Sequence, residues 1–212
     1  MNKNSLDLYV GEDFVSAFAF SAFVALTEKQ LAFTTIKIDL KKRENYLPEY
    51  RDLSLTSKVP TLKHGAFALS ESSAIAEYLD EVFPAPDHQT LYPKSAEHRA
   101  RARQLQAWLR SDLLVIRKER PADLIYFKQS VSELSEEAAF ATERLYRAAN
   151  VLLAGDSGNL FGDWSIADVD LAIMLNRLVS SGENVPANLE DYVNHQWTRP
   201  SVQAWMQLPR AR

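Results

Sequence analysis

The chain has 212 residues, 46% of them apolar and 25% charged, with a formal net charge of −4 and no cysteine. This length can bury a sizeable core, and the mild acidic balance gives no electrostatic reason to expect nucleic acid or an anionic membrane as the main partner. Without cysteine there can be no disulfide, no thiolate metal site and no cysteine nucleophile.

The start of the chain carries no pattern typical of a membrane or export signal. The longest early uncharged stretch, 14–27, is 14 residues long, whereas a membrane-spanning helix needs about 20. Glu12 and Asp13 precede this stretch, where a signal peptide would carry positive charge. The sequence therefore predicts a cytoplasmic protein.

The first part of the chain predicts alternating strands and helices. Apolar and β-branched residues indicate strands at 6–10 and 33–39, with a buried helix at 14–29 between them. Two short runs, 59–62 and 66–69, are joined by a turn and predict a hairpin. An amphipathic helix is expected at 71–82.

The rest of the chain predicts helices only. A proline-rich segment, 84–94, indicates a linker. Helical patterns follow at 95–119, 132–154 and 165–181, with two shorter helices around Asp191 and Ser201. The expected fold is an α/β domain over 1–83, a linker over 84–94 and an all-helical domain over 95–212.

Pro60 stands at the start of a predicted strand in the segment Lys58–Leu62. It is either an ordinary strand-initiating trans proline or a cis proline. A cis bond after Val59 would turn the preceding backbone outward, toward a ligand. The sequence leaves both open.

Two helix starts carry polar side chains suited to an anion. Ser70, Glu71, Ser72 and Ser73 open the helix at 71–82, and free amides and hydroxyls at a helix start can hold a carboxylate or phosphate. Glu71 could hold an ammonium group, so the turn suits the backbone end of an amino acid. The alternative is plain N-capping by Ser70. Ser16 likewise is either a cap or a donor to a ligand anion.

The order of these segments resembles the glutathione transferase family, which joins a thioredoxin-like domain to an all-helical domain. The segment KVPTL at 58–62 resembles the cis-proline segment of that family, and ALSESSAIAEYL at 68–79 resembles its γ-glutamyl-binding turn. The position of Ser16 resembles serine-type members, of the tau and zeta kind. The segments RARARQLQAWLRSDL and IRKERP look most similar to bacterial YfcF-type transferases.

This resemblance implies a glutathione site. Glu71 and Ser72 would hold the γ-glutamyl ammonium and carboxylate, and the Val59 backbone would pair with the cysteinyl unit. Lys58 would reach the glycine carboxylate, and Ser16 would donate a hydrogen bond to the sulfur as the catalytic residue.

Two other hydroxyls rival Ser16 as the catalytic residue. Ser21 lies one helical turn further along the chain, where a packing role is expected, and Tyr9 lies within the first strand. A cleft for the second substrate is expected to use three side chains: Phe14, Trp108 and Arg110.

The implied activity is transfer of glutathione to a hydrophobic electrophile, with reduction of organic hydroperoxides beside it. Glutathione is the expected co-substrate, no metal is expected because the histidines lack ligand spacing, and the protein is expected to be a homodimer. The alternatives are a non-catalytic protein-interaction module on the same scaffold and a zeta-like isomerase.

Two further patterns are interpreted as structural. Ser165 and Asp168 have the spacing of a helix capping box, which serves folding. Arginines at helical spacing, Arg99, Arg103 and Arg110 among them, are interpreted as a solvated face or a dimer-interface stripe.

Overall fold

A computed structural model describes residues 5–153, 155 and 158–210, and the chain divides into two compact units. The first unit runs to Leu91 and also takes in the segment that begins at Pro200; the second spans Tyr92–Arg199. Within the described residues, no helix is both long enough and apolar enough to cross a membrane.

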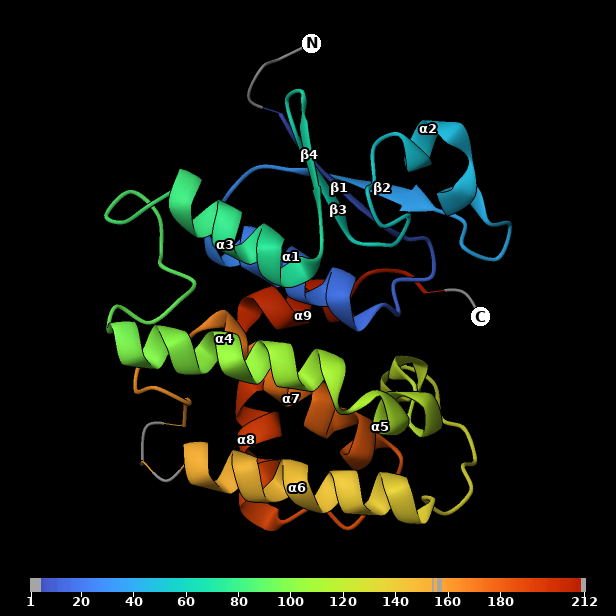
Figure 1. Cartoon of the computed structure of the whole chain (residues 1–212), viewed down its shortest axis with the longest axis vertical. Helices are drawn as coiled ribbons and strands as arrows, with labels where there is room; N and C mark the ends of the chain where they lie inside the picture. The colour runs from blue at the N-terminus through green and yellow to red at the C-terminus, as the bar shows by residue number, and fades with distance from the viewer. Residues whose placement is uncertain (1–4, 154, 156–157, 211–212) are drawn as a thin grey trace. The chain divides into compact units, whose positions relative to one another are not determined.

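The first unit is built on a four-stranded mixed sheet with the strand order β2-β1-β3-β4 (Figure 1). Its strands are β1 (Leu6–Gly11), β2 (Thr34–Ile38), β3 (Thr61–His64) and β4 (Phe67–Ser70). β1 runs parallel to β2 and antiparallel to β3, and β3 runs antiparallel to β4. These strands confirm the α/β class expected for the first part of the chain.

The register of the sheet brings four strand ends together. Gly11 pairs with Ile38, Tyr9 pairs with Thr61, and Thr61 pairs with Ser70. The ends of β1, β2 and β4 therefore lie beside the start of β3, and we call this side the loop end of the sheet. The chain segments that follow or precede those strand ends must meet there.

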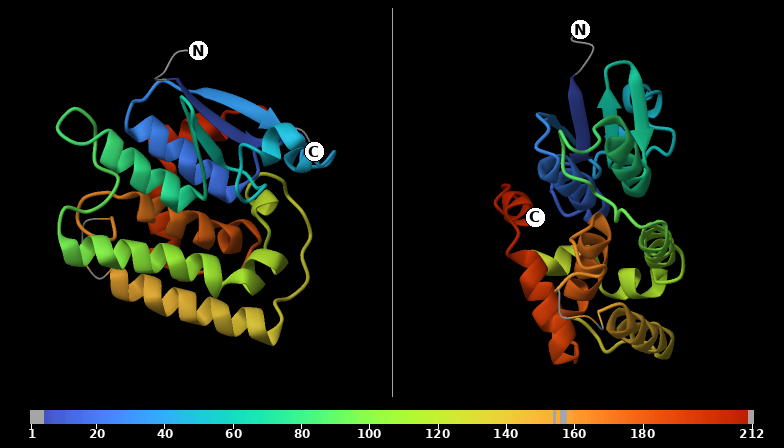
Figure 2. Two further views of the ribbon diagram at one scale, coloured as in Figure 1. Left: turned by 45° about the horizontal axis from the view of Figure 1, so that its top comes forward. Right: turned by 90° about the vertical axis from the view of Figure 1, so that its left-hand side faces the viewer.

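Two helices of the first unit pack against the sheet, and a third packs against one of these two. α1 (Ala17–Glu28) packs against α3 (Ser72–Val82) and against α9 (Pro200–Met206), as the views in Figure 2 also show. A short helix, α2 (Pro48–Arg51), and a 3-10 turn, Glu44–Tyr46, lie between β2 and β3 in the chain. The sequence patterns did not predict these two short elements.

The last helix, α9, packs within the first unit, and the division into domains at 1–83 and 95–212 stays a prediction. α9 belongs to the first unit because Trp205, which is 0% exposed, packs edge-on against three phenylalanines of that unit. The ring centroids of Phe14, Phe20 and Phe23 lie 5.6, 5.8 and 5.2 Å from that of Trp205. Helical patterning alone does not indicate which unit a short helix joins.

The second unit is all-helical and is centred on one buried helix. It contains α4 (Ala96–Ser111), α5 (Leu114–Glu119), the 3-10 turn Ala122–Ile125, α6 (Glu136–Leu152), α7 (Ile166–Ser180) and α8 (Ala187–Trp197). α7 is buried from Ile166 to Leu178 and packs against α4 and α8. The end predicted at 154 for the α6 helix lies outside the described residues.

The prediction of a single helix at 95–119 is wrong, because the helix is interrupted at Asp112 and Leu113. The carbonyls of Leu109 and Arg110 accept hydrogen bonds of 2.7 and 2.8 Å from the Arg117 guanidinium. In a continuous helix these carbonyls would bond to the backbone N–H groups four residues further on. The arginine side chain thus satisfies them where the helix ends.

The capping box at the start of α7 is confirmed. The Asp168 carboxylate accepts hydrogen bonds from the Ser165 N–H at 2.9 Å, the Leu160 N–H at 2.8 Å and the Tyr192 hydroxyl at 3.0 Å. Burial raises the pKa of Asp168, although these donors act in the opposite direction. The box ties a loop and α8 to the start of α7, as expected of a folding element.

Candidate functional site

Ser16 is the N-cap of α1 and stands at the loop end of the sheet. Its Oγ accepts a hydrogen bond of 3.3 Å from the Ala19 N–H, and its backbone is extended. A serine hydroxyl accepts through its lone pairs and still carries one hydrogen to donate. Because Ser16 is half-buried, capping of α1 and donation to a ligand anion are compatible.

The segment before β3 contains a cis peptide bond between Val59 and Pro60, which answers the alternative that the sequence left open. The Lys58 side chain is exposed and Val59 is half-buried. The Lys58 carbonyl accepts a hydrogen bond of 2.8 Å from the Tyr50 hydroxyl and lies 3.2 Å from the Thr61 hydroxyl. Buried side chains thus contact the backbone of the segment that precedes β3.

The turn between β4 and α3 places Glu71 as the N-cap of α3. Glu71 is exposed and has a φ of 73°, in the left-handed region that a non-glycine residue rarely adopts. The alternative in which Ser70 caps the helix is therefore wrong. The Ser70 hydroxyl is instead buried and lies 2.9 Å from the Ser54 hydroxyl. Ser72, the first helical residue, is buried beneath the turn.

The sheet register brings these three segments to one place. Ser16 follows β1, Lys58 and Val59 precede β3, and Glu71 and Ser72 follow β4, all at the loop end. The loop end thus combines a hydroxyl at one helix start, a stretch of backbone and a carboxylate at a second helix start. This set can bind a small zwitterion that has a peptide backbone and a reactive anionic atom.

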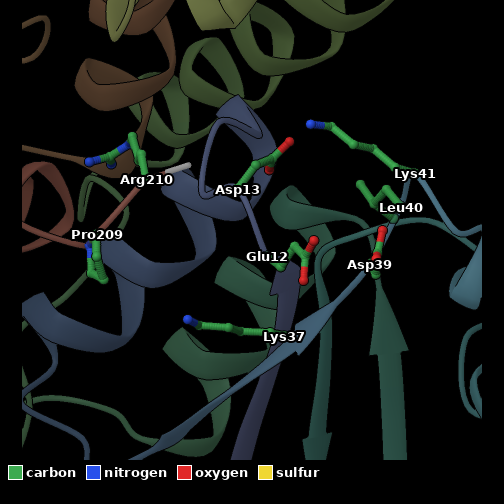
Figure 3. A pocket seen from close by; sticks show the side chains of 8 residues that line it. All are labelled: Glu12, Asp13, Lys37, Asp39, Leu40, Lys41, Pro209 and Arg210. Carbon is green, nitrogen blue, oxygen red and sulfur yellow. The ribbon is translucent and has the colours of Figure 1, made fainter. Parts of the chain in front are cut away.

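A pocket of about 390 Å³, lined mostly by charged residues, lies at the same end of the sheet (Figure 3). In Figure 3 the Asp13 and Lys41 side chains point toward each other from two different loops. The residues that line the pocket are Glu12, Asp13, Lys37, Asp39, Leu40, Lys41, Pro209 and Arg210. The sequence patterns did not predict this pocket. The feature that could have indicated it is the group of charged residues that directly follow two parallel strands.

The loop that carries Ser16 is fastened by the end of the described chain. The Arg210 guanidinium donates a hydrogen bond of 3.2 Å to the Phe14 carbonyl and further bonds to carbonyls at the end of α9, including a 2.8 Å bond to that of Trp205. Phe14 has a φ of 52° and its ring is 3% exposed. The Lys37 ammonium lies 5.1 Å from the centre of that ring.

The other two residues predicted for the second-substrate cleft lie on α4 in the second unit. Trp108 is half-buried, with the Arg144 guanidinium 5.9 Å from its ring centre. Arg110 pairs with Asp170 at 3.3 Å and donates to the Gln106 carbonyl at 2.8 Å. Their part in a cleft with Phe14 stays a prediction.

The two rivals of Ser16 differ from it in their surroundings. Ser21 is 1% exposed, within α1, and its Oγ has no hydrogen-bond partner among the described residues. Tyr9 packs edge-on against Tyr50 with ring centroids 5.8 Å apart, and burial and the charge of Asp7 raise its pKa. Of the three hydroxyls, that of Ser16 lies at a helix start, where an anion would be stabilised.

A four-stranded mixed sheet flanked by α1 and α3, followed by an all-helical unit, is the fold of the glutathione transferases, with their thioredoxin-like first domain. Models of the glutathione S-transferase N-terminal and C-terminal domains match residues 15–82 and 95–211. Because these matches cover more than half of the chain, it belongs to the glutathione S-transferase family.

Individual relatives agree with this assignment. A glutathione transferase homologue from Burkholderia, solved with bound glutathione, is 47% identical, covers 96% of each chain and superposes with a TM-score of 0.79. Mouse glutathione S-transferase theta-3 is 34% identical over 103 residues, which are 49% of this chain and 41% of that protein. Arabidopsis glutathione S-transferase F10 is 37% identical over 90 residues, which are 42% of this chain and 39% of that protein. The chain thus spans less than half the length of these curated relatives.

Proposed function

We propose that this chain is a serine-type glutathione transferase that attacks electrophiles with the thiolate of bound glutathione. The observation that carries the proposal is the meeting of Ser16, the Lys58–Val59 backbone and the Glu71 turn at one end of one sheet. The similarity to the Burkholderia homologue that was solved with bound glutathione supports the choice of ligand. We also propose that the chain is most closely related to the bacterial YfcF-type transferases.

Ser16 would act by stabilising the thiolate. A free thiol has a pKa of about 8.5, so only a few per cent is ionised at pH 7. A hydrogen bond to a charged acceptor is worth about 1.5–3 kcal/mol, and a helix start adds about 0.3–1 kcal/mol. At about 1.36 kcal/mol per pH unit, these contributions lower the thiol pKa to between about 5.5 and 7. Thiolate then predominates near neutral pH without a general base.

The rest of the tripeptide would be held by the other two segments. The exposed Glu71 carboxylate would pair with the γ-glutamyl ammonium, and the first turn of α3 at Ser72 would receive the γ-glutamyl carboxylate. The Val59 backbone would bond to the cysteinyl unit, and the exposed Lys58 would reach the glycine carboxylate. An amino-acid end held in this way directs the sulfur toward the start of α1.

Calorimetric titration with glutathione tests the proposal, with one variant and one matched control. Glu71→Gln removes the charge at the turn, and we expect it to weaken glutathione binding about tenfold or more, as the loss of a charge-assisted hydrogen bond predicts. Glu81→Gln removes an exposed charge at the other end of α3, and we expect it to bind like the wild type. A wild-type chain that fails to bind glutathione would exclude the proposed function.

Turnover assays with an aryl halide and with an organic hydroperoxide separate the two proposed reactions. We expect the conjugate with the aryl halide, and we expect the hydroperoxide to be reduced to its alcohol as two glutathiones are oxidised to their disulfide. A protein that binds glutathione but turns over neither substrate would favour the interaction-module alternative. We also propose that the protein is a homodimer, which light scattering tests, and that it is cytoplasmic, which cell fractionation tests.

A further inference from the structure

We propose that four buried hydroxyls, those of Tyr50, Ser54, Thr61 and Ser70, position the backbone that receives glutathione. We call them the hydroxyl network. This inference rests on the proposed function and extends it to residues that touch no ligand. It assigns a role to α2 and the turn after it, which the sequence patterns did not predict.

The hydroxyl network is closed and buried. Thr61 donates to Ser54 at 2.9 Å, Ser54 and Ser70 lie 2.9 Å apart, and Thr61 and Ser70 lie 3.2 Å apart. The Tyr50 hydroxyl lies 2.9 Å from that of Thr61. None of the four residues is more than 7% exposed. Buried hydroxyls that all have partners hold their neighbours in one arrangement.

Three hydroxyls of the network lie around the Lys58 carbonyl. It lies 2.8 Å from the Tyr50 hydroxyl, 3.2 Å from that of Thr61 and 3.3 Å from that of Ser54. One assignment uses each hydroxyl hydrogen once. Tyr50 donates to the carbonyl, while Thr61 donates to Ser54, Ser54 to Ser70 and Ser70 to Thr61. The carbonyl oxygen is thereby held toward the interior of the first unit.

Holding this carbonyl inward fixes the direction of the next N–H. The peptide bond between Lys58 and Val59 is trans, and in a trans peptide the C=O and the following N–H point in opposite directions. The Val59 N–H is therefore directed away from the hydroxyl network. This is the donor that the proposed function assigns to the cysteinyl unit of glutathione.

The same network also holds the turn that carries Glu71. Ser70 directly precedes Glu71, and its side chain lies between those of Ser54 and Thr61. One set of hydroxyls thus links the two backbone segments that would grip opposite parts of the tripeptide. Loss of one hydroxyl should loosen their spacing and weaken glutathione binding, while bound glutathione should still react through Ser16.

Calorimetry and steady-state kinetics on the full chain test this role. We expect Tyr50→Phe and Thr61→Val each to raise the Kd and KM for glutathione about twofold to tenfold, the effect of one hydrogen bond. We expect kcat at saturating glutathione to change less than twofold. Thr61→Ser keeps the hydroxyl and should restore wild-type affinity. Combined, Tyr50→Phe and Thr61→Val should weaken binding by less than the product of their single effects, because both hydroxyls belong to one hydrogen-bonded network.

The matched controls remove hydroxyls from the same unit outside the hydroxyl network. Tyr78→Phe removes a hydroxyl bonded to His64 at 2.8 Å, and Thr27→Val removes one bonded to the Phe23 carbonyl at 2.8 Å. We expect both controls to bind glutathione like the wild type. The positioning role is overturned if the network variants bind like the wild type, or if the controls weaken binding equally. A wild-type chain that does not bind glutathione overturns the proposed function and this role together.

Discussion

Lys29 is a fully buried lysine, and its removal should destabilise the first unit strongly. Its ammonium lies 3.1 Å from the Asp80 carboxylate of α3 and donates hydrogen bonds of 2.8 Å to the carbonyls of Phe83 and Gln89. The two side chains are 0% and 5% exposed. The Asp80 carboxylate also accepts a 2.7 Å hydrogen bond from the Leu91 N–H. This pair holds the proline-rich segment after α3 against the end of α1.

Lys29→Met removes the cation but leaves the carboxylate in the interior. Breaking a buried ion pair in this way costs about 3–5 kcal/mol, because the protein interior solvates the remaining charge poorly. For a chain of this size, 1 kcal/mol corresponds to about 2–4 °C in Tm. We therefore expect Tm to fall by roughly 6–20 °C. Replacing both partners, as Lys29→Met with Asp80→Asn, removes the buried charge and should recover at least about 2 kcal/mol.

Urea denaturation followed by tryptophan fluorescence measures these differences, with Lys118→Met, an exposed lysine on α5, as the control. The control should change the free energy of unfolding by less than about 0.5 kcal/mol. A cost below about 1 kcal/mol for Lys29→Met would refute the reasoning. So would a double variant that is no more stable than Lys29→Met alone.

Two further predictions concern the hydrogen-bonded pair of Glu119 and Ser135 and the aromatic cluster around α9. The hydroxyl and N–H of Ser135 lower the pKa of Glu119. This carboxylate therefore stabilises the fold above its unfolded-state pKa of about 4.3. The stabilisation is lost as the pH falls through the lower folded-state pKa. Glu119→Gln should make stability less dependent on pH in acid denaturation; an unchanged acid profile would contradict this. Trp205→Ala should cost about 3–5 kcal/mol in urea denaturation, because the indole is 0% exposed among three phenylalanines; a cost below about 1 kcal/mol would show that the cluster is not the core of the first unit.

Local patterns were enough to predict the order of the strands and longer helices. Apolar and β-branched residues identified β1 and β2, and the spacing of Ser165 and Asp168 identified the start of α7. These features depend on residues a few positions apart, so a single sequence contains the whole signal. The same holds for Ser16, which caps α1 through the nearby Ala19.

What the sequence did not reveal depends on contacts between distant residues. Lys29 bonds to carbonyls 54 and 60 positions away, and no local pattern distinguishes it from a surface lysine. The hydroxyl of Tyr50 meets that of Thr61 only when α2 folds beside the start of β3. Such contacts require the tertiary structure.

The central claim, that Ser16 stabilises the glutathione thiolate, is tested most directly by titrating the ultraviolet absorbance of the thiolate in the glutathione complex. We predict a thiol pKa between about 5.5 and 7 in the wild type and in the Ser21→Ala control. In Ser16→Ala, with glutathione still bound, we predict that the pKa rises toward the value of about 8.5 for a free thiol. A thiol pKa that is the same in Ser16→Ala as in the wild type would contradict the claim.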